Sequence, residues 1–184
     1  MGEVERLETG AAEFPRATWM SFDRYSRYGA VQRLLRANLG QGHLKVLEVG
    51  DSAGYLQQFD GEVSVVCTDL SMSQDPLADT IRTVADGGSL PFGSGAFDAV
   101  TAVDVFEHVP AAARQDFLKE LIRVTRDILV LAAPFNTPGV WGAETFVRHY
   151  AFMAMGKPQD QLEEHRAAGL PDLAETISSL SSAG

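Results

Sequence analysis

A nine-residue segment, VLEVGDSAG at positions 46–54, combines two glycines with two carboxylates. Gly50 and Gly54 allow a tight turn after a buried strand and a close approach of a ligand to the backbone. Asp69 follows 19 residues after Gly50, at the end of the next apolar run. A carboxylate there can accept hydrogen bonds from both hydroxyls of an adenosine ribose. The segment therefore predicts a site for an adenosine-containing cofactor.

The two carboxylates of this segment, Glu48 and Asp51, help to distinguish between cofactors. A dinucleotide such as NAD would lay its diphosphate on the turn and on the start of the following helix. One like-charge pair at about 4 Å costs on the order of 4 kcal/mol at an effective dielectric near 20. S-adenosylmethionine instead carries a sulfonium, an ammonium and one carboxylate; acidic neighbours suit its cations, and exposed amides at the helix start suit its carboxylate. Charge therefore favours S-adenosylmethionine.

His108 is the ionisable side chain that we expect to face the reacting group. It could take a proton from a hydroxyl or amine substrate, contact the cofactor, or only pack at the start of a helix with Glu107. The other three histidines (His43, His149 and His165) are scattered along the chain, and no Cys/His/Asp cluster has ligand spacing, so no metal site is expected.

Aromatic side chains are candidates for a substrate pocket. Trp19 and Trp141, with Phe14 and Tyr28, could line such a pocket or pack in the core, and Trp141 follows the last strand, where substrates enter this kind of fold. The sequence does not separate the two roles.

Five short apolar runs alternate with longer segments, the pattern of an α/β domain with a mainly parallel, doubly wound sheet. The runs predict strands at 45–49, 63–69, 80–84, 97–104 and 127–134. Helical periodicity predicts a helix over 21–39, a helix that begins within 53–59, and another within 110–126. Three further helices are expected at 143–155, 158–167 and 171–180.

A single domain is therefore expected over residues 1–184. It comprises a helical segment (1–42), a cofactor-binding core (43–134) and a helical tail (135–184), the last a truncated substrate or lid region. No internal repeat or linker divides the chain.

Composition excludes several partners. The chain carries 15 basic and 25 acidic residues and a formal charge of −10, so we expect no nucleic-acid partner. No apolar stretch approaches the roughly 20 residues that span a bilayer, and the N-terminus lacks a signal peptide, so we expect a cytoplasmic protein with no membrane partner. The one cysteine, Cys67, lies in an apolar run and is expected to be a buried thiol.

The sequence resembles the class I S-adenosylmethionine-dependent methyltransferases, of a small-molecule, bacterial-like type. VLEVGDSAG looks like their E/D-x-G-x-G-x-G turn, VVCTDLS resembles their acidic end of strand two, and ADGGSLPFGSGAFDAVTAVDVFEHVP resembles their segment through strand four. The resemblance covers residues 45–134. It implies a Rossmann-like fold with strand order 3-2-1-4-5.

The resemblance also implies a role for each matching residue. The methionine part of the cofactor would contact Gly50, Gly54 and Glu48, and its ammonium group would lie beside Asp104. The adenosine part would contact the ribose-binding Asp69, the adenine-packing Leu70, and Asp86 and Gly87 at the adenine amino edge, although Asp86 could instead be only a turn residue. His108 completes the set of cofactor-binding candidates, and no catalytic residue is assigned.

Two departures from the family pattern stand out. Ser52 occupies the position of the middle glycine, where a positive φ would cost strain and could weaken cofactor binding. The hairpin that normally closes the sheet is not found in residues 135–184. Either the chain is a fragment of a longer protein, which the bacterial-like tail EEHRAAGLPDL (163–173) favours, or the helical tail covers the edge of strand five.

We therefore expect a methyltransferase that acts on a small-molecule or carrier-linked acceptor. A non-catalytic, partner-binding domain of the same fold is one alternative, and an NAD-dependent oxidoreductase is another. The open edge of strand five or the apolar tail helices could pair two chains, so the sequence leaves the oligomeric state open between a monomer and a homodimer.

Overall fold

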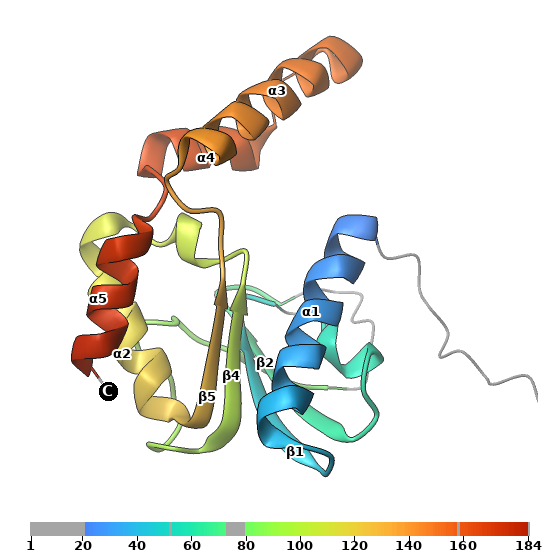
Figure 1. Ribbon diagram of the computed structural model, residues 1–184, viewed down its shortest axis with the longest axis vertical. Helices are drawn as coiled ribbons and strands as arrows, with labels where there is room; N and C mark the ends of the chain where they lie inside the picture. The colour runs from blue at the N-terminus through green and yellow to red at the C-terminus, as the bar shows by residue number, and fades with distance from the viewer. Residues whose placement is uncertain (1–20, 52, 73–79, 158, 184) are drawn as a thin grey trace, which may run out of the picture.

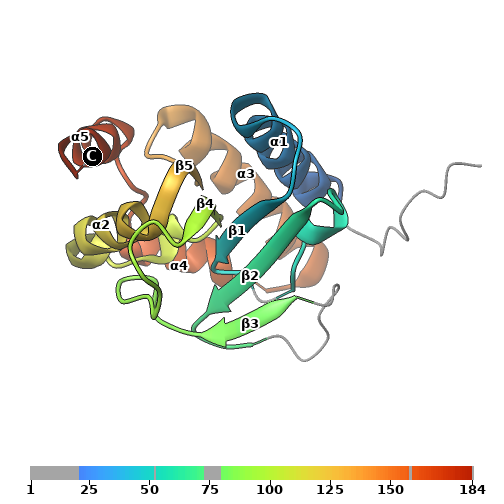
Figure 2. The same ribbon diagram turned by 90° about the horizontal axis from the view of Figure 1, so that it is seen from below.

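A parallel sheet of five strands runs through the middle of the computed structural model, which describes residues 21–51, 53–72, 80–157 and 159–183. The strand order is β3-β2-β1-β4-β5, as the sequence predicted, and Figure 2 shows the twisted sheet along this order. The strands are β1 (Leu44–Val49), β2 (Val63–Asp69), β3 (Ile81–Val84), β4 (Phe97–Val103) and β5 (Thr125–Ala132).

The central strands are apolar on both faces because helices cover both sides of the sheet. Every residue of β4 is buried, and β1 and β2 each expose only their second residue, Lys45 and Ser64. The edge strands β3 and β5 are more exposed. Register places Glu48 of β1 between Cys67 of β2 and Thr101 of β4.

One face of the sheet packs against α1 (Phe22–Leu39). The Ser21 side chain caps the start of this helix by accepting a hydrogen bond from the Arg24 amide, and the helix ends at Gly40, whose φ is 75°. The residues that α1 buries are Tyr28, Val31 and Leu35, with the smaller Gly29.

The opposite face packs against α2 (Arg114–Val124), and α5 (Leu173–Ala183) lies against α2. Figure 1 shows the resulting layers, with α1 on one side of the sheet and α2 and α5 on the other. Phe117, Leu118, Leu121 and Val124 of α2 fill the core on this side.

The helices α3 (Pro138–Met155) and α4 (Asp160–Ala168) lie beyond the carboxyl ends of the strands (Figure 1). Short 3-10 turns lie at η1 (Leu56–Gln58), η2 (Phe106–His108) and η3 (Ala111–Ala113). No strand follows β5 in the described residues, so the predicted helical tail is confirmed and the closing hairpin is not found. None of the described helices combines the length and apolarity that crossing a membrane requires.

Several boundaries differ from the prediction, among them the start of α3, which begins at Pro138 instead of residue 143. The helix expected to begin within 53–59 is only the single turn η1. The Asp51 carboxylate accepts hydrogen bonds from the amides of Ala53, Gly54 and Tyr55, just before this turn. The helix expected within 110–126 begins at Arg114, after η3. Strand five begins at Thr125 instead of residue 127, because the chain passes from α2 directly into β5.

Candidate functional site

An open crevice of about 970 Å³ lies at the carboxyl ends of β1, β4 and β5, bounded by the first turns of α1 and by α4. Ligands of open α/β sheets bind at this edge, outside the carboxyl ends of the strands. The lining contains four carboxylates and two arginines. The ionisable and glycine residues that line it are Asp23, Arg24, Arg27, Tyr28, Gly50, Asp51, Tyr55, Asp104, Glu107, His108 and His165.

Gly50 forms the turn that directly follows β1 and lines the crevice. Its φ is 80°, and a Cβ atom built there would lie 2.0 Å from Cγ2 of Val105. The amide of Gly50 donates a 2.7 Å hydrogen bond to the Thr68 carbonyl. Both the backbone conformation and the close approach of Val105 therefore require glycine.

Asp51 holds the segment that follows the turn. Its carboxylate accepts hydrogen bonds from the amides of Ala53 (2.7 Å), Gly54 (3.1 Å) and Tyr55 (3.1 Å). These amides were expected to be exposed for a ligand carboxylate; that expectation is wrong, because an internal carboxylate already occupies them. Gly54 is buried with a φ of 79° and takes part in this cap. The sequence departure at Ser52 lies outside the described residues.

Glu48, expected beside the cofactor, is buried behind the crevice. Its side chain is 1% exposed and does not line the crevice. Burial raises its pKa well above the usual value and the charge of Asp51 adds to the shift, whereas a hydrogen bond from Tyr28 opposes it. The thiol of Cys67, buried as predicted, lies 3.9 Å from the carboxyl Oε2, and burial raises its pKa to about 12.

Asp104 lies on the crevice wall directly after β4. Its φ of 56° is the one positive φ outside glycine among the described residues. The carboxylate forms an ion pair with Arg27 of α1, which also pairs with Asp23. Asp104 was expected beside the ammonium group of a ligand. In the structure, the guanidinium of Arg27 is the positive charge beside this carboxylate.

Asp69 and Leu70 lie at the end of β2, outside the crevice lining. Asp69 is half-buried and accepts a 3.3 Å hydrogen bond from the Ser71 amide, and Leu70 is 74% exposed. The chain that follows, 73–79, lies outside the described residues. Both residues therefore lie at the same carboxyl edge of the sheet as the crevice, at the end of the strand next to β1.

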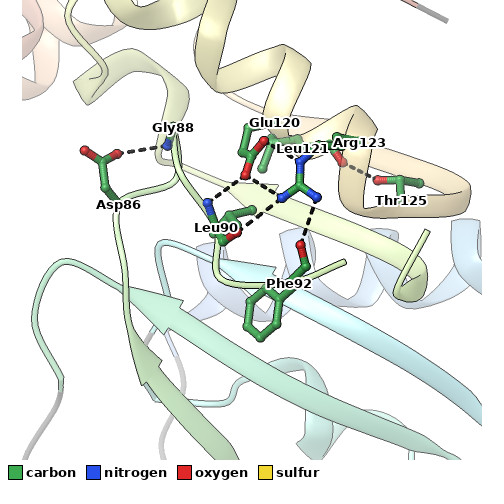
Figure 3. A network of polar contacts seen from close by, with 8 residues as sticks. All are labelled: Asp86, Gly88, Leu90, Phe92, Glu120, Leu121, Arg123 and Thr125. Atoms are coloured by element: carbon green, nitrogen blue, oxygen red, sulfur yellow. Dashed lines mark hydrogen bonds and ion pairs between the residues drawn. The ribbon is translucent and has the colours of Figure 1, made fainter. Parts of the chain in front are cut away.

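Asp86 and Gly87 belong to a turn that α2 holds in place (Figure 3). Asp86 is exposed, and its carboxylate accepts a 2.9 Å hydrogen bond from the Gly88 amide, as in the turn role considered for it. Glu120 and Arg123 of α2 fix the following residues through the Leu90 amide and the carbonyls of Leu90 and Phe92.

Gly87 packs under α2. A Cβ atom there would lie 2.3 Å from Cε2 of Phe117 and 3.3 Å from Cγ1 of Val49. Neither Asp86 nor Gly87 lines the crevice. Close packing against α2 is thus sufficient reason for the glycine, independent of any ligand.

His108 lines the crevice and lies beside a histidine that is distant from it in sequence. Its ring centroid is 4.9 Å from that of His165 on α4, and its Nδ1 is 3.0 Å from Oε2 of Glu164. His165 in turn has Nδ1 2.8 Å from Glu144 Oε1 and Nε2 3.9 Å from Glu107 Oε1.

The pairing of His108 with His165 was missed from the sequence, where His165 was grouped with His43 and His149 as scattered. Glu107 is buried, and burial raises the pKa of its carboxyl group. One signal could have suggested the pairing: each histidine directly follows a glutamate, in FEHVP and in EEHR.

Several other crevice residues were missed or misplaced. Arg27 was not singled out, although its (i, i+4) spacing from Asp23 placed both on one face of the predicted helix. Of the aromatic candidates, Tyr28 lines the crevice, whereas Trp141 does not and donates its indole N–H to Asn136 Oδ1 at 2.7 Å. Phe14 and Trp19 lie outside the described residues.

Comparisons with known proteins agree with this architecture. Residues 47–128 match a family model described as a methyltransferase domain, which confirms the resemblance seen in the sequence. A search of curated proteins finds no match.

Solved structures share the fold at low sequence identity. The YcgJ protein of Bacillus subtilis is 16% identical, with a TM-score of 0.59 over 85% of this chain and 68% of that one. A candidate methyltransferase from Bacillus halodurans is 19% identical, with a TM-score of 0.59 over 86% and 68%. A candidate sarcosine dimethylglycine methyltransferase from Galdieria sulphuraria is 18% identical, with a TM-score of 0.60 over 88% and 61%.

Proposed function

We propose, on the basis of the match of residues 47–128 to a methyltransferase-domain model, that the chain is a class I methyltransferase and transfers a methyl group from S-adenosylmethionine to an acceptor. The observation that carries the proposal is the crevice at the carboxyl ends of β1 and β4, where the carboxylate of Asp104 forms an ion pair with the guanidinium of Arg27. In this site the Arg27 guanidinium stands in for a ligand ammonium group. A ligand that carries both an ammonium and a carboxylate can then bind Asp104 with one end and the neighbouring arginines with the other.

The same crevice disfavours a dinucleotide. A diphosphate would need the amides that follow the glycine turn, and the Asp51 carboxylate already accepts hydrogen bonds from three of them. Among its described residues, the segment between β1 and β2 contains only the turn η1, so no long helix begins there. The same contacts withhold these amides from the carboxylate of S-adenosylmethionine, so the preference over NAD rests on the methyltransferase-domain match and on the acidic crevice residues Asp51 and Asp104, and not on Glu48, which is buried.

The role of the protein in such a transfer is to bind, orient and exclude water. When bound, S-adenosylmethionine supplies a methyl group that its sulfonium activates. Asp104 and Gly50 would hold the methionine part, so that an acceptor in the crevice lies in line with the methyl group. His108, on the same wall, can take a proton from a hydroxyl or amine acceptor.

The remaining assignments stay predictions. Asp69 and Leu70 would contact the adenosine part, at the neighbouring strand end. Asp86 and Gly87 would shape the adenine edge through the turn that α2 fixes. The small-molecule or carrier-linked acceptor, the cytoplasmic location and the three-part organisation also stay predictions.

Isothermal titration calorimetry with S-adenosylmethionine and, separately, with NADH tests the proposal. We expect one binding site for S-adenosylmethionine and no heat from NADH. Absence of binding at millimolar S-adenosylmethionine would favour the non-catalytic, partner-binding domain. Binding of NADH alone would favour the oxidoreductase.

A further inference from the structure

Two imidazoles and one carboxylate converge where α4 packs on η2. Glu107 and His108 come from η2 and His165 comes from α4. One potential ligand atom from each residue lies within 4.8 Å of those of the other two. Two histidines and a glutamate form a ligand set that binds zinc and other divalent transition metals, with a further coordination position left open.

Glu144 gives this cluster the support that metal-binding histidines usually have. Its Oε1 lies 2.8 Å from Nδ1 of His165. A proton on Nδ1 that is donated to Glu144 leaves the lone pair of Nε2 pointing toward the cluster, 3.9 Å from Oε1 of Glu107. Donor atoms on one tetrahedral ion are roughly 3.3 Å apart for bonds near 2.0 Å, so a small movement of either side chain would allow both to bind one cation.

The buried carboxylates supply an independent observation. The side chain of Glu107 is 2% exposed, and its Oε2 has no hydrogen-bond partner among the described residues. Oε2 of Glu144 is likewise buried and unpaired within the described part of the chain. Arg114, the guanidinium on the neighbouring helix, donates instead to the carbonyls of Val109 and Gly169. A buried carboxylate oxygen without a partner is costly, and a bound cation would remove that cost.

We propose that Glu107, His108 and His165 bind one divalent transition-metal ion of the zinc type, with Glu144 orienting His165. Such an ion joins the α3–α4 pair to the end of β4 through η2. All three ligands line the crevice, so a water molecule or an acceptor oxygen in the crevice can reach the open coordination position. The metal site does not depend on the proposed methyl transfer, because the ligands are complete without a cofactor. With the ion bound, His108 is a ligand and does not act as the general base considered above.

Metal binding to the full chain, without a polyhistidine tag and stripped with a chelator, tests the site directly. Zn²⁺ is titrated in competition with a chromophoric chelator, and Co²⁺ binding is followed by its visible absorption. We expect one tightly bound ion per chain and intense Co²⁺ bands typical of four-coordinate geometry. Substitutions His165→Gln and Glu107→Gln should each weaken binding by about 100-fold or more, and Glu144→Gln by about 10- to 100-fold.

His149→Ala is the matched control, because His149 is an exposed histidine on α3 outside the cluster. Circular dichroism checks that each variant is folded, and the two ligand substitutions on different elements keep the test valid if one of them unfolds. The proposal is overturned if the wild-type chain binds no zinc, if the folded cluster variants bind as tightly as wild type, or if His149→Ala weakens binding equally. Loss of S-adenosylmethionine binding alone would leave these readouts unchanged and would count only against the proposed function.

Discussion

Glu48 lies in the core behind the glycine turn, and its carboxyl group links stability to pH. Because burial raises its pKa, the folded protein holds the proton more tightly than the unfolded chain does. The stability that this difference contributes is fully present below the usual value near 4.5 and is lost as the pH rises through the higher folded value.

Replacing Glu48 with glutamine should remove this dependence. Urea unfolding of the wild type and of Glu48→Gln, from about pH 4 to about pH 9, measures the free energy of unfolding of each. We expect the wild type to lose stability relative to the variant as the pH rises. A difference between the two proteins that stays constant over this range would contradict the buried, proton-retaining carboxyl group.

Asp104 is the residue whose charge the proposed cofactor site needs most. Replacement by asparagine would keep the backbone, since asparagine tolerates a positive φ, and would remove the negative charge. For Asp104→Asn we expect binding of S-adenosylmethionine to weaken by about 1.5–3 kcal/mol, as for the loss of a hydrogen bond to a charged group. Calorimetry measures the change.

Asp127→Asn is the control for this substitution. Asp127 is an exposed carboxylate of β5 outside the crevice, and its replacement changes the net charge by the same amount. If both variants bind as the wild type does, Asp104 is not a ligand of the ammonium group. Equal weakening in both would assign the effect to overall charge.

Residue positions were predictable where backbone geometry dictates them. Gly50, Asp104 and His108 follow strand ends, and all three line the crevice. The burial of Glu48 was missed because β1 is apolar on both faces, so its pattern does not show which side chains face the ligand. Two-residue periodicity places Glu48 on the same face as Val46, which packs under α1.

At the scale of elements, the turn of residues 86–92 packs closely against helix α2 because Gly87 has no side chain to keep Phe117 away. Gly87→Ala would push a methyl group into Phe117, whereas at the adjacent Gly88 the nearest atom is Asp86 Oδ1 at 3.5 Å, an ordinary contact. Thermal and urea unfolding should show Gly87→Ala destabilised by about 1–3 kcal/mol, as in overpacked cores, and Gly88→Ala nearly unchanged. Similar stability of the two variants would refute the packing role of Gly87.

The elements themselves were largely predictable from periodicity, and their ends were not. The five strands stand out as short, nearly continuous apolar runs, and the helix on residues 22–39 stands out because its apolar residues recur every three to four positions. The segment after β1 contains apolar residues at helical spacing, yet it forms only η1. The cap by Asp51 fixes the backbone just before η1, and the chain forms only this one turn there.

At the scale of the whole molecule, the strand order followed from the family resemblance, whereas the meeting of η2 with α4 could not be predicted. His108 and His165 are far apart in sequence, and their contact depends on how the chain returns after β5 through α3 and α4 (Figure 1). No periodicity encodes such a return, because it arises from packing between segments. The tail thereby adds His165 to a crevice that the sheet and α1 otherwise form.

The central claim is that the crevice beside Asp104 is the site of the methyl donor. A crystal structure of the chain with S-adenosylhomocysteine, the product of the proposed transfer, tests it most directly. We predict density for the ligand beyond β1 and β4, with its ammonium group at Asp104 in place of Arg27 and its ribose toward Asp69. Density for the ligand elsewhere, or a crevice filled by the protein's own side chains at saturating ligand, would contradict the account.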